Sequence, residues 1–422
     1  MNFPTGKTLA ESLDREDPLG ACRERFYIPK RENGEEEIYF CGNSLGLQPK
    51  SARRYVQEVL EAWARMGVRG HFEGYHPWLP YHEFASEKLA RLMGALPLEV
   101  AAMNSLTANL HLLMVSFYRP TPEHHKILIE AHAFPSDRYA VESQIRVHGF
   151  DPDESLIEAR PRQGESIIRM DDLLELIERE GESIALILWP GVQFYTGQAF
   201  ALEKIAEAGH RKGCTVGFDL AHAASNLVLN LHDSQADFAV WCSYKYLNAG
   251  PGAVAGCFVH ERHAKRFDLP RFAGWWGHDK STRFAMPPRF NPLAGAEGWQ
   301  LSNPPILSLA PLLASLDLFD EAGMEALRAK SEKLTGYLER LLIERCGDKV
   351  AILTPPEPAE RGCQLSIRLQ DAKRMHERLI ASGITCDWRE PDVIRLAPVP
   401  LYNRFAEVFD FVDRLQRMLE HA

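Results

Sequence analysis

Two ionisable side chains stand just past apolar, strand-favouring runs of the sequence. Lys245 follows the run 236–242 after one serine and one tyrosine, and Asp219 directly follows the run 214–218. A lysine delivered by a buried strand loses hydration, so it shifts its pKa or reacts. One chemistry suits this pair: the lysine forms a Schiff base with pyridoxal phosphate (PLP), and the acid pairs with the pyridinium nitrogen of that cofactor. The sequence therefore predicts a PLP site built on Lys245 and Asp219.

Length and charge narrow the classes of protein to which the chain can belong. At 422 residues it is too long for one typical hydrophobic core, which predicts two domains. Its net charge of −10 argues against a nucleic-acid-binding protein, which needs a basic face. The longest apolar stretches, such as 184–189, are too short to span a bilayer, and the first residues show no apolar run typical of a secretory signal. We expect a globular enzyme that binds neither nucleic acid nor membrane.

The eight cysteines are scattered along the chain, with no C-x-x-C pair among them. Structural metal sites and disulfide frameworks need clustered cysteines. We therefore expect free, mostly buried thiols in a reducing compartment, a cytoplasmic location and no metal centre.

From residue 126 onwards, short apolar strands alternate with amphipathic helices. The expected strands are 127–129, 184–189, 214–218, 238–242 and 253–259, and the expected helices include 49–66, 84–94, 104–117, one that ends near 147, and 199–212. This alternation predicts a mostly parallel sheet covered on both faces by helices. Ligands bind beyond the carboxyl ends of the strands in such sheets. Asp137, Asp219 and Lys245 all lie just past expected strand ends, so we expect them to meet there.

Three further stretches allow more than one interpretation. Asn104 or Ser105 is an expected N-cap of the helix that continues to Phe117, and the free amides of that helix end would also suit a phosphate dianion. The glycine-rich stretch 250–256 precedes a strand, so we interpret it as a turn and not as a dinucleotide-binding loop. The aromatic stretch 70–81 is typical of a loop that lines a site, or of one that only packs its aromatic rings.

The composition changes between residues 271 and 305, where Gly, Trp, Pro and Asn replace any periodic pattern. A long irregular stretch inside a compact protein is usually functional or disordered, and its aromatic residues argue against disorder. Beyond it we expect helices at 306–319 and 324–344 and then a region of mixed helices and strands. We expect an N-terminal segment (1–60) that packs with the small domain, a large PLP-binding α/β domain (61–310) and a small C-terminal α+β domain (311–422).

An ordered set of motifs gives the chain a resemblance to a known family. The motifs are G-N-S-L-G-L-Q-P (42–49), S-L-T-A-N-L-H (105–111), F-P-S-D (134–137), G-V-Q-F-Y-T-G-Q (191–198), D-L-A-H-A (219–223), S-Y-K-Y-L-N-A-G-P-G (243–252), G-W-W-G-H (274–278), S-N-P-P (302–305) and R-L-A-P-V-P-L-Y-N (395–403). In this order, over nearly the whole chain, they resemble the kynureninases, which are fold-type-I PLP enzymes of the class V aminotransferase superfamily. The resemblance implies a PLP-dependent transferase-like fold, in which a large domain has a mostly parallel seven-stranded sheet flanked by helices and a smaller C-terminal domain is α+β.

The same resemblance implies a reaction. It is the hydrolytic cleavage of L-kynurenine, and of 3-hydroxy-L-kynurenine, to anthranilate or 3-hydroxyanthranilate and L-alanine, in tryptophan degradation and pyridine nucleotide biosynthesis. Lys245 would carry PLP and act as the base at the substrate α-carbon, with Tyr244 as a proton donor. Asp219, with Asp137 beside it, would keep the pyridine nitrogen protonated. An opposite charge at about 4 Å is worth on the order of 4 kcal/mol at an effective dielectric of 20, or about three pKa units.

Further cofactor contacts are implied in the same way. Phe134 would stack on the pyridine ring, and His222 would lie near the ring and its phenolic oxygen, on the same helix face as Asp219. The remaining cofactor contacts would be Leu106, Thr107, Pro135, Ser136, Tyr244, Trp275 and Asn303. Trp275 and Asn303 would come from a partner subunit, which implies a homodimer with shared sites.

The substrate contacts implied are fewer. Arg395 would bind the α-carboxylate through a bidentate fork, a geometry that lysine cannot copy. His71 and Asn303 would face the aromatic end of the substrate, and the remaining implied contacts are Asn43 and Ser44. Pro190 stands where related sequences often carry a small or hydroxylated residue, and because proline has no amide hydrogen we assign it no ligand role.

Two other functions fit the same PLP site. A class V aminotransferase or a cysteine desulfurase-like lyase would use a similar lysine and acid. A desulfurase also needs a mobile cysteine, and Cys41 and Cys242 are the cysteines near the motifs, with Cys242 on an expected buried strand. A PLP-dependent sensor or scaffold would keep the cofactor without turnover, but Lys245, Asp219 and Arg395 together argue against it.

Overall fold

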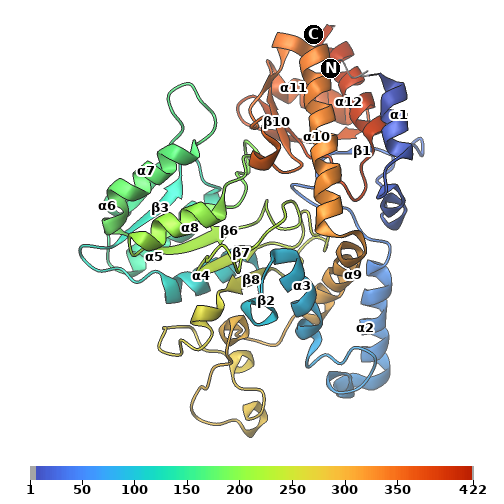
Figure 1. Ribbon diagram of the computed structural model, residues 1–422. Coiled ribbons are helices and arrows are strands. Elements are labelled where there is room, and N and C mark those ends of the chain that lie inside the picture. The colour runs from blue at the N-terminus through green and yellow to red at the C-terminus, as the bar shows by residue number, and fades with distance from the viewer. Residues whose placement is uncertain (1–5, 421–422) are drawn as a thin grey trace.

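The computed structural model describes residues 6–420, and its centre is a seven-stranded sheet (Figure 1). The strands, in their order across the sheet, are β2 (Val100–Ala102), β8 (Gly256–Val259), β7 (Phe238–Trp241), β6 (Thr215–Asp219), β5 (Ile184–Pro190), β3 (Lys126–Glu130) and β4 (Leu156–Ala159). β8 runs antiparallel to both of its neighbours, and every pairing from β7 to β4 is parallel. The expected α/β fold with a mostly parallel seven-stranded sheet is confirmed.

The central strands are apolar because both faces of the sheet are covered. Ile127 and Ile129 of β3 belong to one hydrophobic cluster, and Leu128 between them belongs to another. Successive strand residues point to opposite faces, so a continuously apolar strand needs a helical layer on each face. The first layer contains α4 (Leu106–Phe117) and α5 (Pro135–Val147), and the second contains α7 (Met170–Glu180) and α8 (Leu202–Arg211). The short α6 (Pro152–Ser155) leads into β4.

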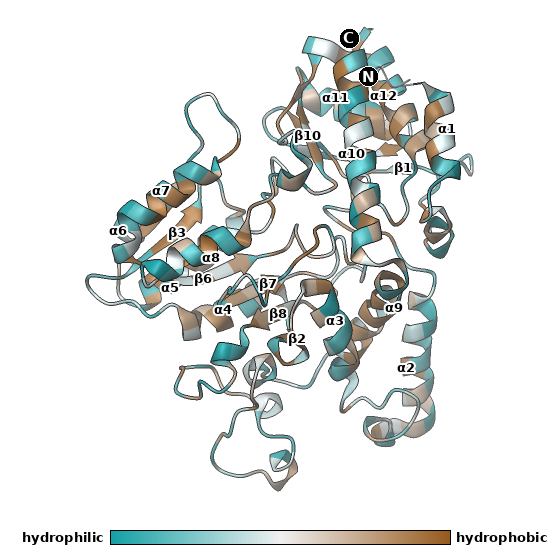
Figure 2. Cartoon of the chain, viewed as in Figure 1, coloured by the Kyte–Doolittle hydropathy of each residue, from teal (hydrophilic) through white to brown (hydrophobic). Residues whose placement is uncertain are grey.

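Three more helices pack together beside the sheet: α2 (Ala52–Met66), α3 (Ser86–Met93) and α9 (Ile306–Ala322) (Figure 1). α9 is mostly brown in Figure 2 because it is rich in leucine and alanine, and most of these leucines are buried, whereas much of α2 is teal. Asp317 of α9 makes an ion pair with Lys88 of α3 and accepts a hydrogen bond from Tyr55 of α2, so one carboxylate joins the three helices.

The C-terminal part has its own antiparallel sheet of four strands. Their order is β12 (Asp387–Arg389), β13 (Val393–Leu396), β10 (Leu365–Arg368) and β9 (Ala351–Ile352), and the accompanying helices are α10 (Met324–Cys346), α11 (Ala372–Ala381) and α12 (Phe405–Glu420). N-terminal residues join this part of the molecule. β1 (Ile38–Tyr39) pairs in parallel with β11 (Ile384–Thr385), and α1 (Lys7–Arg15) packs against α12 at the end that holds both termini (Figure 1).

The division of the chain into domains remains our proposal. The contacts of α1 and β1 support an N-terminal segment, 1–60, that packs with the small domain 311–422. α2 and α9 each cross an expected boundary of the large domain, 61–310, and they pack against each other. Residues 1–5 and 421–422, at the ends of these ranges, lie outside the described residues.

The irregular stretch 271–305 contains three short 3-10 helices, Trp275–Gly277, Arg283–Ala285 and Ala296–Trp299, and an isolated β-bridge between His278 and Pro292, so it lacks long regular elements, as its composition predicted. It forms the gold loops at the bottom of Figure 1, far from the C-terminal helices.

All eight cysteines are free and six of them are buried, which confirms the expectation of free, mostly buried thiols. Within residues 6–420 no helix has the length and apolar character needed to cross a membrane.

Candidate active site

The reactive side chains predicted from the sequence meet at the carboxyl ends of the central strands. Asp219 is the last residue of β6, and Lys245 follows the end of β7 by four residues. The Lys245 Nζ atom lies 3.0 Å from His222 Nε2 and 5.9 Å from the centre of the Phe134 ring. Asp137, in the first turn of α5, shares a hydrogen bond with Asp219. The structure therefore brings the lysine, the histidine, the phenylalanine and both acids into one site.

The two acids are not equivalent. Burial and the neighbouring Asp219 carboxylate raise the pKa of Asp137 well above its ordinary value. Burial also raises the pKa of Asp219, but hydrogen bonds from the Ala221 amide, at 2.6 Å, and from Asp137 oppose that rise. Asp137 therefore stays protonated and donates a hydrogen bond to Asp219, which stays ionised and carries the negative charge.

His222 reaches the site from a different local structure than expected. We expected Asp219 and His222 to share a helix face, but residues 221–226 form consecutive turns. Asp219 accepts from the amide two residues on, a local hydrogen bond that competes with helix formation. Burial, and then the charge of Lys245, lower the pKa of His222 well below its ordinary value. The imidazole is neutral, so its Nε2 accepts a hydrogen bond from Lys245.

Two helix N-termini meet where the cofactor phosphate was expected. The Thr107 hydroxyl of α4 lies 2.7 Å from the Ser136 hydroxyl of α5. We expected Asn104 or Ser105 to cap α4, but Ser105 occupies the N-cap position without a side-chain cap bond, and the Asn104 amide donates to Asn109. The first turn of α5 likewise has no side-chain cap. Such uncapped amides and the positive ends of the helix dipoles favour a dianion.

The residues of this site fit PLP. Leu106 and Pro135 are the first residues of the two uncapped helices. The Phe134 ring, 46% exposed, has an open face. His222 Nδ1 is buried without a partner, although such an atom is costly to leave unpaired. A ring that carries both a protonated nitrogen and a phenolic oxygen offers partners for donors and acceptors of this kind.

Tyr244 borders the same site. Its ring centre lies 6.0 Å from Lys245 Nζ, and its hydroxyl is hydrogen-bonded to Cys242. Burial and the neighbouring Cys242 raise the pKa of Tyr244. The phenol therefore stays protonated and can donate a proton.

Arg395 lies on β13 and is almost completely buried, at 1% exposed. It donates through Nη1 to the carbonyl of Phe194 at 2.7 Å and through Nη2 to the Ser44 hydroxyl at 3.2 Å. The Phe194 ring meets the Phe134 ring edge to face, with centres 5.3 Å apart. Asn43, next to Ser44, is fully buried and donates to Gln364, so its amide supports the loop.

Three expected site residues lie apart from this group within the described chain. The Trp275 indole donates to the Arg283 carbonyl, and its ring is 41% exposed. Asn303 is exposed, and His71 packs edge to face against Trp78. Their roles in binding stay predictions.

Glu130 is a site residue that the sequence analysis missed. It ends β3 and is 3% exposed. Burial and the charge of Asp219 raise the pKa of Glu130 to about 8, although a hydrogen bond with Gln193 opposes the rise. The signal was available, because an acid at the end of a buried strand is also what pointed to Asp219.

Glu130 gives the apoprotein a testable pH dependence. The folded state binds this proton more tightly than the unfolded state, so Glu130 lowers the free energy of unfolding as pH rises from about 4.5, and its effect levels off above about 8. Between about pH 4.5 and pH 8, the free energy of unfolding of Glu130→Gln should therefore rise by on the order of 5 kcal/mol relative to that of wild type. Urea unfolding at several pH values measures this. The exposed Glu123→Gln variant is the control, and equal pH profiles for wild type and Glu130→Gln would contradict the account.

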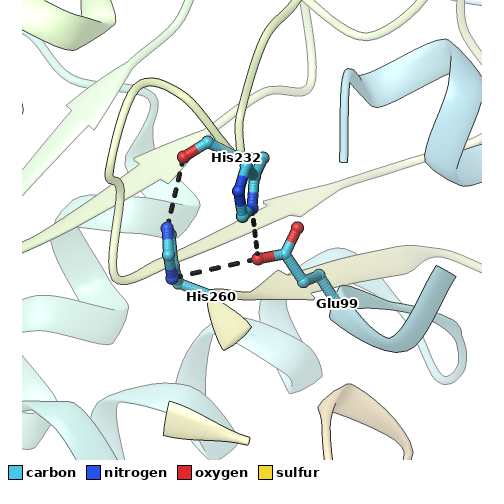
Figure 3. A group of neighbouring side chains, drawn as sticks. All are labelled: Glu99, His232 and His260. Atoms are coloured by element: carbon cyan, nitrogen blue, oxygen red, sulfur yellow. Dashed lines mark hydrogen bonds and ion pairs between the residues drawn. The ribbon is translucent and has the colours of Figure 1, made fainter. Parts of the chain in front are cut away.

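A second group of ionisable residues lies at the opposite edge of the sheet. Glu99, His232 and His260 are close enough together to hold a metal ion (Figure 3). Their ligand atoms are already engaged, because Glu99 Oε1 accepts from the Glu261 amide at 2.8 Å and lies 3.0 Å from His232 Nδ1. His260 Nδ1 accepts from the Arg262 amide at 3.1 Å. We assign this group a structural role.

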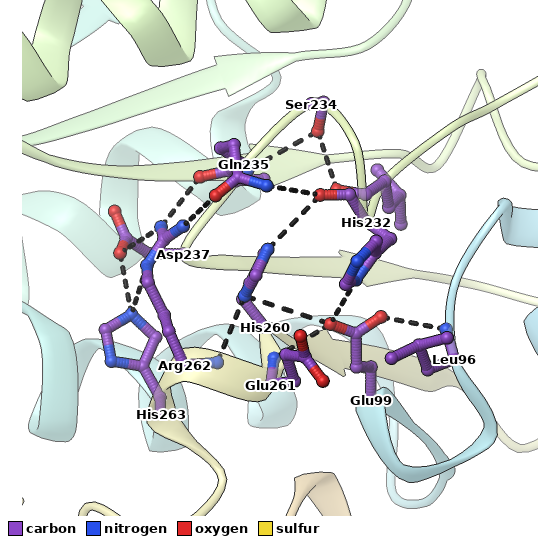
Figure 4. Close-up of polar contacts among 12 residues, drawn as sticks. Leu96, Glu99, His232, Ser234, Gln235, Asp237, His260, Glu261, Arg262 and His263 are labelled. Carbon is purple, nitrogen blue, oxygen red and sulfur yellow. Dashed lines mark hydrogen bonds and ion pairs between the residues drawn. The ribbon is translucent and has the colours of Figure 1, made fainter.

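Asp237 continues the same network at the amino ends of β6 and β7 (Figure 4). It accepts from the Val216 amide at 2.7 Å, from His263 at 2.7 Å and from Arg262 at 2.6 Å. Burial raises the pKa of Asp237, but hydrogen bonds from His210 and His263 outweigh burial and hold it far below its ordinary value. The network secures the edge of the sheet that lies away from Lys245.

Comparisons with known proteins agree with this geometry. Residues 327–415 match a family model described as "Kynureninase C-terminal domain". Solved structures with a similar fold include cysteine desulfurase CsdA from Escherichia coli (TM-score 0.77, 17% identity, 96% of this chain and 98% of that chain). Another is a C-DES mutant with glycine covalently linked to its PLP cofactor (TM-score 0.76, 16% identity, 93% and 98%). At these identities the likeness shows the fold alone.

The curated relatives are much more similar. A kynureninase of Koribacter versatilis is 58% identical over 413 residues, which cover 98% of this chain and 97% of the relative. A kynureninase of Myxococcus xanthus is 59% identical over 415 residues, 98% and 97% of the two chains. One of Xanthomonas campestris is 56% identical over 420 residues, 99% of each. Identity at this level over nearly the whole length of both chains shows that the chain belongs to the kynureninase family.

Proposed function

We propose that this protein uses PLP to cleave L-kynurenine hydrolytically between Cβ and Cγ, giving anthranilate and L-alanine, a reaction of tryptophan degradation. The observation that carries the proposal is that Lys245, Asp219 and Phe134 meet at the edge of the sheet formed by the carboxyl ends of its central strands, in a chain 56–59% identical to kynureninases. The same edge is where ligands bind in open α/β sheets.

The cofactor would be held at both ends. Lys245 Nζ would bind its aldehyde carbon, and the uncapped starts of α4 and α5, with the Thr107 and Ser136 hydroxyls, would bind its phosphate. Phe134 would cover one face of the ring, and Asp219 would pair with the ring nitrogen. When bound, PLP supplies an electron sink for the substrate α-carbon.

The protein's own residues move the protons. Lys245 Nζ would take the proton from the substrate α-carbon, and neutral His222 Nε2, 3.0 Å away, orients that amine. The Tyr244 hydroxyl, kept protonated by burial, would return a proton to the alanyl product. Arg395 would bind the α-carboxylate and so fix the α-carbon relative to Lys245.

The aromatic end of the substrate would face His71 and Asn303. A polar pair there would tolerate a ring hydroxyl, so we propose 3-hydroxy-L-kynurenine as a second substrate. Kinetics with both substrates side by side test this: a kcat/KM for 3-hydroxy-L-kynurenine more than about 100-fold below that for L-kynurenine would count against a pocket that accepts the hydroxyl.

The activity itself is tested by incubating purified protein with PLP and L-kynurenine and following anthranilate fluorescence. Cysteine desulfurases share the fold, so release of sulfide from L-cysteine is the competing result. The cysteines argue against it. Burial raises the pKa of Cys41 to about 11 and also raises that of Cys242, so neither thiol is readily ionised. Binding of PLP without either product would favour a sensor or scaffold.

We also propose a homodimer in which Trp275 and Asn303 complete the partner's site. Exposed aromatic rings support an interface there, because Phe72 and Phe284 are 61% and 52% exposed, and the Phe284 ring packs against both Phe72 and Trp275. Mixing Lys245→Ala with Asn303→Ala, each of which should be inactive alone, tests shared sites. Exchange of subunits should restore up to about a quarter of wild-type activity by regenerating one intact site per mixed dimer. No recovery, with mixed dimers shown to form, would place each site within one chain.

A cytoplasmic location is our further proposal. Eight free cysteines are typical of proteins in a reducing compartment. Fractionation of the source cells with an antibody against the chain tests it, and recovery outside the cytoplasm would contradict it.

A further inference from the structure

The guanidinium of Arg395 is held by a neighbouring acid on the same small sheet. Asp387 and Arg395 stand directly opposite each other in the antiparallel pair of β12 and β13. Residues in this position are close enough for their side chains to interact. Asp387 Oδ2 forms an ion pair with Arg395 Nη2, and both side chains are shielded, at 10% and 2% exposed.

Two of the three guanidinium nitrogens of Arg395 have hydrogen-bond partners, and the third has none. Nη1 donates to the Phe194 carbonyl, and Nη2 donates to Asp387 and to the Ser44 hydroxyl. Nε is buried and has no partner. An unpaired buried donor on a charged group is costly, and a carboxylate would satisfy it. The contacts on Nη1 and Nη2 fix the plane of the guanidinium and leave its Nε without a partner.

Asp387 is itself held in place and balances the local charge. Ser44 donates to Asp387 Oδ2, and Arg389 Nη2 donates to the same oxygen at 3.1 Å. Two arginines and one aspartate leave a single net positive charge, which matches one carboxylate. Both arginines lower the pKa of His222, which contacts Lys245, so the cluster acts on the reactive site.

We propose that Asp387 is a positioning residue: it holds Arg395 by Nη2 so that the Nε edge of the guanidinium faces the substrate α-carboxylate. The inference rests on the proposed function, in which Arg395 binds that carboxylate. Asp387 stands opposite Arg395 only through the register of β12 and β13, so the sequence alone indicates no role for it.

The opposite possibility makes a different prediction. If Asp387 competed with the substrate for Arg395, its removal would free the guanidinium and tighten binding. If Asp387 positions Arg395, its removal lets the side chain turn toward other acceptors and weakens binding. The sign of the change in KM therefore decides between the two.

The test compares Asp387→Asn with wild type, using Asp392→Asn on the same β12–β13 turn as the matched control. We expect the KM for L-kynurenine to rise about ten- to hundredfold in Asp387→Asn, as loss of a charged hydrogen bond predicts, with a smaller change in kcat. The inhibition constant of L-alanine should rise in parallel. That of 2-aminoacetophenone, which has the aromatic ketone but no α-carboxylate, should stay within twofold, as should the dissociation constant of PLP.

Other outcomes would overturn the inference. A KM that falls or stays within twofold would show that Asp387 competes for Arg395 or is dispensable, and an equal rise for 2-aminoacetophenone would show general distortion of the site. If Asp387→Asn fails to fold, Ser44→Ala, which removes the other acceptor of Nη2 together with the hydroxyl that donates to Asp387, should raise the KM in the same direction, and no rise would refute the idea. Wild-type turnover of L-kynurenine tests the proposed function separately. Binding of L-alanine and of 2-aminoacetophenone can also be measured as dissociation constants, which do not require turnover of L-kynurenine.

Discussion

Replacing Lys245 with alanine is expected to lower the turnover of L-kynurenine by more than about 10⁴-fold, the upper range for a single acid–base group. Lys245 would both carry PLP and remove the α-proton, and no neighbour can replace it. Burial and the charge of Lys245 hold the pKa of His222 well below its ordinary value, so its imidazole is a weak base, and the phenol of Tyr244 is kept protonated. Anthranilate fluorescence measures the loss.

The matched control for this substitution is Lys204→Ala, which removes an exposed lysine of α8 and should keep wild-type turnover. Circular dichroism should show that both variants fold. Turnover by folded Lys245→Ala above about one hundredth of wild type would refute the assignment of the base to this amine.

Replacing Asp219 with asparagine is expected to lower kcat about 10³-fold. The carboxylate would pair with the protonated ring nitrogen, and an opposite charge at about 4 Å is worth on the order of 4 kcal/mol at an effective dielectric of 20, or three powers of ten. The asparagine keeps the shape and the hydrogen bond from Ala221 but removes the charge.

Asp137→Asn is the matched comparison, because Asp137 is already protonated and donates a hydrogen bond to Asp219. Asparagine can donate in the same way, so we expect this variant to lose tenfold or less. Steady-state kinetics on both variants at one pH measure the difference. Equal losses for the two substitutions would mean that the charge is shared, and a larger loss for Asp137→Asn would place it on Asp137.

The fold and the centre of the site could be predicted from the sequence because strand ends carry a strong signal. Apolar runs that end in Asp219 or lead to Lys245 mark the edge of a parallel sheet where ligands bind. The sequence could not predict the turns after Asp219, because an aspartate suits a helix N-cap as well as a local turn. The hydrogen bond from the Ala221 amide decided between them.

Other features depend on pairings between distant residues. Asp387 meets Arg395 through strand register, and Thr107 meets Ser136 through the packing of two helices. Neither contact follows from the spacing of residues along the chain. The uncapped state of Ser105 is similar, since serine at that position usually caps the helix.

The most direct test of the account asks which residue binds the cofactor. The protein loaded with PLP is reduced with borohydride, digested, and mapped by mass spectrometry. The account predicts one phosphopyridoxyl group, on Lys245, and loss of that label in Lys245→Ala. A label on another lysine, or bound PLP that leaves Lys245 unmodified, would contradict it.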